Sequence, residues 1–187
     1  MHGAILTAWR LWDIIYYHCT RLVYVDKPND NIFRVVTKRY WGNTLRAGSQ
    51  DVISAGDYYV KLHIHNYQLA RRLKGLEGEM RLGLSALKAV RNSLPALARY
   101  VAEHPERDNI RGIVGTTILY RGAVPLGFHI QDIESPVFCW FKTAFFKLIL
   151  FICHPNGLRR VRYKTEKLVA KRVFMSKEEL LERYFGD

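Results

Sequence analysis

The chain has 187 residues, of which 49% are hydrophobic and 13% aromatic, so it can bury a core and is not globally disordered. This length fits one compact domain, and we expect residues 1–187 to form a single α+β domain. The formal net charge of +12 favours a negatively charged partner: nucleic acid, an anionic membrane surface, or an acidic or phosphorylated glycan.

Three cysteines, Cys19, Cys139 and Cys153, are odd in number and scattered along the chain. This usage predicts reduced, buried thiols in a cytosolic protein rather than a disulfide framework. The first ten residues lack a basic region followed by an uninterrupted apolar core, so we expect no cleaved secretory signal. A cytoplasmic location follows as the expectation.

The first third of the chain predicts a helix over 4–23, a strand over 32–40 and a hairpin arm or loop over 45–53. The helix carries an aromatic stripe that we expect to dock on the protein's own sheet, with membrane contact as the alternative.

The clearest strand follows a Gly56-Asp57 turn and covers residues 58–65, and we place it at the centre of a mixed sheet. Its apolar side carries Tyr58, Val60, Leu62 and Ile64, and its other side carries Tyr59, Lys61, His63 and His65.

Residues 66–78 read as a basic loop that leads into an amphipathic helix over 78–103. Pro95 removes a backbone donor inside this helix, so we expect a kink, or two abutting helices with Ser93 as the cap of the second.

Residues 110–133 predict a small β-α-β unit: a strand over 110–114, a turn, a brief helix over 118–126 stopped by Gly127, and a strand over 128–133. The two strands would run parallel, and a hairpin is the alternative.

Ser135-Pro136 begins a nearly continuous apolar helix over 136–153. It is slightly short for a bilayer, and Lys142 and Lys147 would lie near the bilayer centre, so we do not expect it to span a membrane. Two interpretations remain: a helix buried in the domain with its lysine heads extending outward, or one lying in a membrane interface.

A strongly basic segment covers 158–174 and predicts a strand pair with one cationic face. Its candidate residues for contact with an anionic surface are Arg159, Arg160, Arg162, Lys164, Lys171 and Arg172. Ser176 and Glu179 fit the capping box of a closing helix.

Two histidines, His63 and His65, project from one face of the central strand and could share a metal ion. Zinc or iron would need a further ligand, for which His129 and Asp132 are the candidates. The sequence assigns no metal and no cofactor on this basis. The cysteines lie in apolar helices, which argues against a Cys–His hydrolase, and no nucleic-acid-binding motif is present.

The order of strand 58–65, basic loop, helix, strand 110–114 and Gly127-Phe128 before a late strand resembles the core of GNAT-type acyltransferases. In that family the loop after the central strand holds the pyrophosphate of coenzyme A. Arg71, Arg72, Lys74 and Gly75 are the candidates for this role, because the loop could present three cations and backbone donors to a phosphate at a helix N-terminus. Glu77 stands where the family motif requires Gly or Ala, and its carboxylate would repel a pyrophosphate.

A set of short motifs along nearly the whole chain resembles the YkoP-like family of small bacterial proteins. The motifs are Arg10-Leu11-Trp12-Asp13, Phe33-Arg34-Val35, Tyr40-Trp41-Gly42, Gly56-Asp57, Lys61-Leu62-His63-Ile64-His65-Asn66, Leu119-Tyr120-Arg121, Leu126-Gly127-Phe128, and the closing Met175-Ser176, Leu181 and Arg183-Tyr184. Members are found alongside or fused to polysaccharide-processing enzymes, so the resemblance implies an envelope or exopolysaccharide context and such an enzyme as a partner. It supplies no catalytic residues.

We therefore expect a non-enzymatic accessory protein of envelope polysaccharide metabolism at the cytoplasmic membrane face. An acyl-CoA-dependent acyltransferase and a His-based metal protein are the alternatives.

Overall fold

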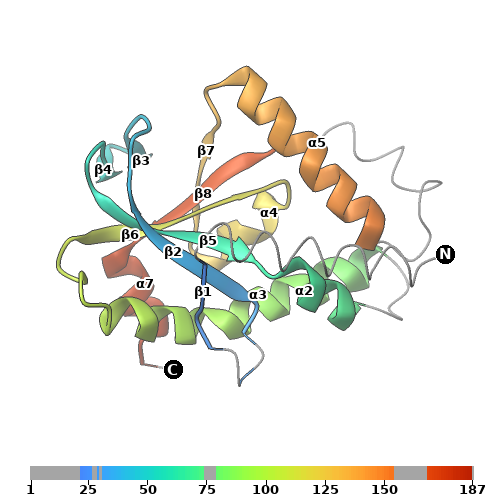
Figure 1. Cartoon of the computed structure of the whole chain (residues 1–187), viewed down its shortest axis with the longest axis horizontal. Helices are drawn as coiled ribbons and strands as arrows, with labels where there is room; N and C mark the ends of the chain where they lie inside the picture. The colour runs from blue at the N-terminus through green and yellow to red at the C-terminus, as the bar shows by residue number, and fades with distance from the viewer. Residues whose placement is uncertain (1–21, 27–28, 30, 74–78, 154–167, 187) are drawn as a thin grey trace.

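The computed structural model, which describes residues 22–26, 29, 31–73, 79–153 and 168–186, confirms an α+β fold (Figure 1). The main sheet has the strand order β1 (Val23–Tyr24), β2 (Phe33–Arg39), β5 (Tyr58–Ile64), β6 (Ile110–Thr117), β8 (Lys171–Ser176) and β7 (His129–Asp132). A separate hairpin pairs β3 (Leu45–Ala47) with β4 (Gln50–Ile53). The helices are α2 (Asn66–Leu73), α3 (Glu79–Ala102), α4 (Tyr120–Ala123), the short 3₁₀ turn η1 (Val124–Leu126), α5 (Pro136–Cys153) and α7 (Lys177–Tyr184).

Strand β5 is an interior strand, as the sequence predicts. It pairs antiparallel with β2 and parallel with β6, while every other neighbouring pair of the main sheet is antiparallel. The turn before it uses Gly56 at φ 96°, a conformation that glycine adopts without strain. Val60 in the middle of the strand is fully buried.

One face of the sheet is covered by α3 and α7 (Figure 1) and holds the largest apolar core. Its buried members include Val35, Val60, Leu97, Ile113 and Met175. The hairpin and α5 lie on the opposite side of the sheet (Figure 1). Two smaller clusters form there, one around Phe174 beneath the hairpin and one around Ala170 beneath α5.

Helix α3 continues through Pro95, so of the two predicted alternatives the division into two helices is wrong, and the kink stays a prediction. Leu94, Leu97 and Val101 are completely buried, and this packing on both sides of the proline offsets the hydrogen bond that it lacks. Ser93 does not cap a second helix. Its hydroxyl accepts a bond from the backbone N–H of Ile32 at 3.2 Å.

The segment 110–133 differs from the predicted unit in one decisive respect. β6 and β7 run parallel, as predicted, but β8 lies between them and pairs antiparallel with both. β6 also continues through 115–117, where we expected a turn. Gly127 ends the helical segment at φ 87°, which confirms the predicted stop.

Both ends of the chain show further differences. Val23 belongs to β1 and not to the predicted helix, whose residues 4–21 lie outside the described part of the chain. Of the predicted basic strand pair, residues 158–167 also lie outside it. Lys171 and Arg172 begin β8, which continues to Ser176.

The predicted capping box is confirmed at the start of α7. The Ser176 hydroxyl accepts from the backbone N–H of Glu179 at 3.0 Å, and the Glu179 carboxylate accepts from the backbone N–H of Ser176 at 3.0 Å. We expect Ser176→Ala to lower the free energy of unfolding by about 1 kcal/mol, because one N–H loses its acceptor. Urea denaturation measures this. Ser49→Ala, in the exposed hairpin turn, should leave the midpoint unchanged, and equal effects of both changes would contradict the assignment.

Candidate functional site

The face of the main sheet opposite α3 carries a concentration of cationic side chains. Tyr59 packs against the cluster beneath the hairpin, so the alternation of β5 places Lys61 and His63 on the same side. Arg34 lies directly opposite His63 across the β2–β5 pair, and Lys38 lies opposite Tyr59. We call Arg34, Lys38, Lys61, His63 and Arg172 the cationic face.

Arg172 reaches this face from β8. Phe174, two residues further along β8, packs beneath the hairpin, and strand alternation puts Arg172 on the same side as Phe174. Its guanidinium donates to the Tyr40 hydroxyl and lies over the Tyr40 ring, 5.5 Å from the ring centre. Lys171 points the other way, donating to Asp132 at 2.8 Å. The two residues of the predicted basic cluster that the structure describes are therefore on opposite sides of β8.

Lys142 of α5 lies within electrostatic reach of Lys61 and His63, and its ammonium group lies over the Phe138 ring, 5.3 Å from the ring centre. Burial, followed by the charges of Lys142, Lys38 and Arg172, lowers the pKa of Lys61. Burial also lowers the pKa of Lys142. The Lys142 side chain is half-buried.

His63 is the most strongly perturbed group of the face. Burial, followed by the charges of Lys61, Lys142, Lys38 and Arg34, lowers its pKa to about 4. Its imidazole is therefore neutral near pH 7. A neutral ring can accept or donate a proton, but it adds no positive charge to the face.

His65 lies beyond the end of β5 and is held by its neighbours. Its ring accepts or donates a hydrogen bond with Gln68 of α2 at 3.2 Å and meets the Tyr24 ring edge-on, with 5.7 Å between centres. The ring is thus positioned by β1 and α2, two elements that the sequence did not predict there.

The other proposed metal ligands are not brought to the two histidines. His129 and Asp132 are on the edge strand β7, separated from β5 by β6 and β8. His129 bonds the Glu179 carboxylate at 2.8 Å, and Asp132 pairs with Lys171. Within the described ranges, the structure contains no group of three His, Cys, Asp or Glu side chains that could hold a metal ion.

The predicted phosphate-binding loop is partly helical. Residues 66–73 form α2, and Arg71 and Arg72 lie in its last turn, at the negative end of the helix dipole. Lys74 and Gly75 lie outside the described residues. The loop predicted over 66–78 is corrected because its first eight residues continue directly from β5 into a helix.

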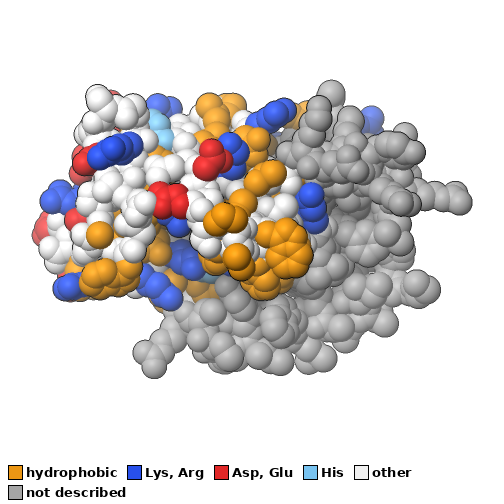
Figure 2. Space-filling model, turned by 90° about the horizontal axis from the view of Figure 1, so that it is seen from above, with side chains coloured by type: hydrophobic (Ala, Val, Ile, Leu, Met, Phe, Trp, Pro, Cys, Tyr) orange, Lys and Arg blue, Asp and Glu red, His pale blue; other side chains and the backbone are white. Residues whose placement is uncertain are grey.

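Helix α5 has an inner and an outer face. Cys139, Thr143 and Phe146, spaced by four and three, face the sheet: Thr143 accepts from the backbone N–H of Ala170 at 2.9 Å, and the other two pack near Ala170. The outer face exposes a set of large apolar side chains: Val137 (77% exposed), Phe138 (42%), Trp140 (71%) and Phe141 (56%). Apolar side chains cover this part of the molecular surface in Figure 2. Burial of the whole helix, the first interpretation from sequence, is therefore wrong for its first turns.

Cys139 is a free thiol, as expected, and is half-buried, with its sulfur 3.6 Å from the carbonyl oxygen of Ala170. Among the described helices, none is both long enough and apolar enough to cross a membrane.

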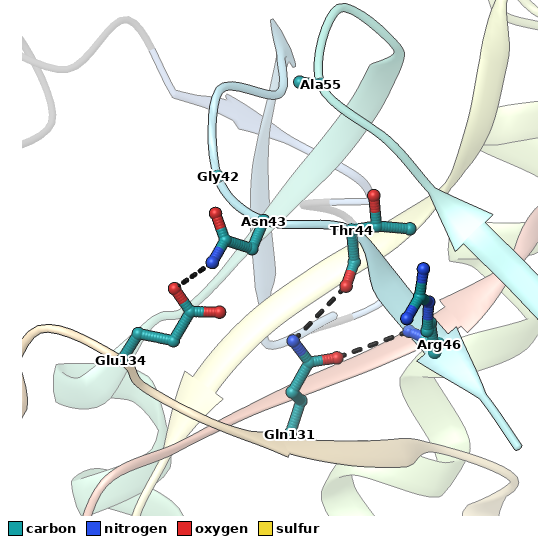
Figure 3. A pocket seen from close by; sticks show the side chains of 7 residues that line it. All are labelled: Gly42, Asn43, Thr44, Arg46, Ala55, Gln131 and Glu134. Carbon is teal, nitrogen blue, oxygen red and sulfur yellow. Dashed lines mark hydrogen bonds between the residues drawn. The ribbon is translucent and has the colours of Figure 1, made fainter.

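An open cavity of about 590 Å³ lies between the hairpin and β7 (Figure 3). It is lined by Gly42, Asn43, Thr44, Arg46, Ala55, Gln131 and Glu134. Gln131 accepts from the backbone N–H of Arg46 at 3.3 Å and donates to the carbonyl oxygen of Thr44 at 3.4 Å, and Asn43 donates to Glu134. These contacts hold the hairpin to β7.

Sequence reasoning missed the most unusual feature, the grouping of Lys38, Lys61, Lys142 and Arg172. Lys61 was placed on the correct side of its strand. Lys38, Lys142 and Arg172 come from β2, α5 and β8, and no local sequence pattern predicts that these elements lie near one another.

Comparisons with known proteins agree with the motifs. A family model for the YkoP domain matches residues 2–184. The chain is 30% identical over 185 residues to the "Uncharacterized protein YkoP" of Bacillus subtilis (strain 168), covering 98% of each chain. No solved structure gives a significant match. The chain therefore belongs to the YkoP family.

Proposed function

We propose that this protein is a non-enzymatic accessory protein that attaches peripherally to an anionic membrane surface through the outer face of α5. The observation that carries the proposal is the exposure of Trp140 and Phe141, with Val137 and Phe138 beside them, on a helix whose opposite side packs on the domain. Contiguous exposed aromatic groups mark interaction surfaces. Tryptophan in particular is favoured at membrane–water interfaces.

Charge supports a membrane as the partner. The protein carries a formal net charge of +12, and the basic residues Arg159, Arg160, Arg162 and Lys164 follow α5 in the sequence. Each cation close to an anionic leaflet contributes about 1 kcal/mol, and apolar insertion adds to this attraction.

The biological context of this attachment stays a proposal that rests on the resemblance to YkoP-like proteins. It is a role beside a polysaccharide-processing enzyme, at the cytoplasmic face of the membrane.

Vesicle co-sedimentation tests the membrane attachment. We expect binding to phosphatidylglycerol-containing vesicles to weaken about tenfold in Trp140→Ser, a difference of about 1.4 kcal/mol, because the variant removes an inserting ring. Trp41→Ser is the matched control, since Trp41 is 78% exposed in the loop after β2, and it should change binding less than twofold.

Two results would count against this mode of attachment. Equal binding to neutral and anionic vesicles removes its electrostatic part. Equal binding of Trp140→Ser and the unmodified protein removes the role of α5.

Acyl-CoA-dependent acyl transfer is a second candidate, favoured by the parallel pairing of β5 with β6. Ligands of α/β sheets bind beyond the carboxyl ends of parallel strands where the chain diverges, and here the chain leaves β5 into α2 and then α3. Calorimetric titration with acetyl-CoA tests this. If millimolar acetyl-CoA gives no binding heat, the protein shares with GNAT-type acyltransferases only an arrangement of strands.

A further inference from the structure

Four cations lie on one side of the sheet within electrostatic reach of one another at Lys61, and no described carboxylate pairs with them. Lys38, Lys61 and Arg172 come from the cationic face, and Lys142 comes from α5 above it. Among the described residues, no Asp or Glu lies within ion-pair distance of any of the four. Glu134, whose charge reaches Tyr40, is bonded to Asn43.

The position of these cations makes their grouping costly in the absence of an anion. Lys61 and Lys142 are half-buried, whereas Lys38 is exposed and leaves the group open to solvent on one side. Like charges withdrawn from water repel one another and lose hydration. The lowered pKa of Lys61 expresses both effects, and the lowered pKa of Lys142 expresses the loss of hydration. A bound anion would remove both penalties at once.

Arg172 is held in place for such a role. Its guanidinium is fixed by the hydroxyl and the ring of Tyr40. Tyr40 is itself buried and donates to the carbonyl oxygen of Asn43 at 2.8 Å. A pre-positioned guanidinium loses little freedom when it meets an anion.

We propose that this group binds the phosphate group of a ligand, with the ammonium groups of Lys61 and Lys142 as direct partners and Lys38 and Arg172 as flanking charges. A phosphate monoester carries a charge of between −1.5 and −2 near neutral pH and three strong acceptor oxygens. It therefore matches four converging cations better than a single carboxylate does. This site lies between α5 and the sheet, and the aromatic groups of the membrane proposal lie on the outer side of α5.

Two sources supply this chemistry: a soluble phosphate compound and a phospholipid headgroup. The probes are inorganic phosphate, titrated at constant ionic strength, and dihexanoyl phosphatidic acid below its micellar concentration. If the lipid binds no more tightly than inorganic phosphate, the ligand is a soluble phosphate compound. If the lipid binds more tightly, the ligand is a phospholipid headgroup. Either outcome supports the site only if the measured affinity falls when Lys61 is substituted.

Calorimetry with substituted full-length protein provides that dependence. We expect Lys61→Gln and Lys142→Gln each to raise the dissociation constant about tenfold, because each removes a direct charge contact. Lys88→Gln, an exposed lysine on α3, removes the same net charge and should change the constant less than twofold. Without ligand, Lys61→Gln should raise the melting temperature above that of the unmodified protein, a result that loss of ordinary packing would not produce.

The proposal is overturned if neither probe binds to the unmodified protein at 50 mM, a concentration that corresponds to a binding free energy of about −1.8 kcal/mol. It is also overturned if Lys61→Gln and Lys88→Gln bind the probes with the same affinity. Membrane attachment is measured with Trp140→Ser on vesicles, so the two proposals can fail separately.

Discussion

Gly112→Ala is expected to lower the free energy of unfolding by about 3 kcal/mol or more, or to prevent folding altogether. A Cβ atom at this position would clash with the carbonyl oxygen of Met175 and would lie 3.2 Å from Ile53. The first contact is with backbone in the adjacent strand β8, where Gly112 pairs with Ser176. Relief therefore requires β6 and β8 to move apart at the centre of the sheet.

Gly115→Ala is the matched control in the same strand. Its Cβ would meet only side-chain atoms, Val173 at 3.3 Å and Leu62 at 3.7 Å, which can shift slightly. Urea denaturation should give a change within about 1 kcal/mol for this variant. Similar losses in the two variants would show that β6 and β8 approach less closely at Gly112 than the structure describes.

A fall in stability between pH 6.5 and pH 4 is the second large effect, and His63 is its source. The folded-state pKa of His63 is about 4, below the ordinary value of 6.5, owing to burial and to the cations Lys61, Lys142, Lys38 and Arg34. Between these two pH values the unfolded chain binds the proton and the folded protein does not. Stability is therefore complete above about pH 6.5 and decreases as the pH falls toward 4.

The size of the effect follows from the two pKa values. Their difference of 2.5, at about 1.4 kcal/mol for each pKa unit, gives roughly 3 kcal/mol. Thermal unfolding from pH 7 to pH 4 measures it. His63→Asn should flatten the curve in this window, whatever its packing loss at pH 7, and an unchanged slope in the variant would show that other groups cause the acid lability.

These effects arise from contacts that are distant in sequence, whereas much of the fold is visible in local patterns. The alternation of 58–64 identified β5, Ser135-Pro136 fixed the start of α5, Gly127 fixed a helix end, and Ser176 fixed the capping box of α7. Each of these signals acts within a few residues, through periodicity, backbone freedom or a cap.

The candidate site was much less predictable. The side of β5 that carries Lys61 and His63 followed from alternation, but the predicted partners His129 and Asp132 proved to be on a strand that β8 and β6 separate from β5. The exposed set around Trp140 was hidden by the uniform apolarity of α5, which gives no periodic signal to say which side packs.

The sequence by itself determined the central strand, several helix ends, the family and the basic character of this protein, because these depend on local patterns, matched motifs and composition. Only the tertiary structure decided that β8 enters between β6 and β7, that α3 remains one helix across Pro95, and that α5 leaves Trp140 exposed. Those outcomes depend on which apolar surfaces, far apart in the sequence, pack against one another. Such packing is a property of the whole folded chain, and no short segment encodes it.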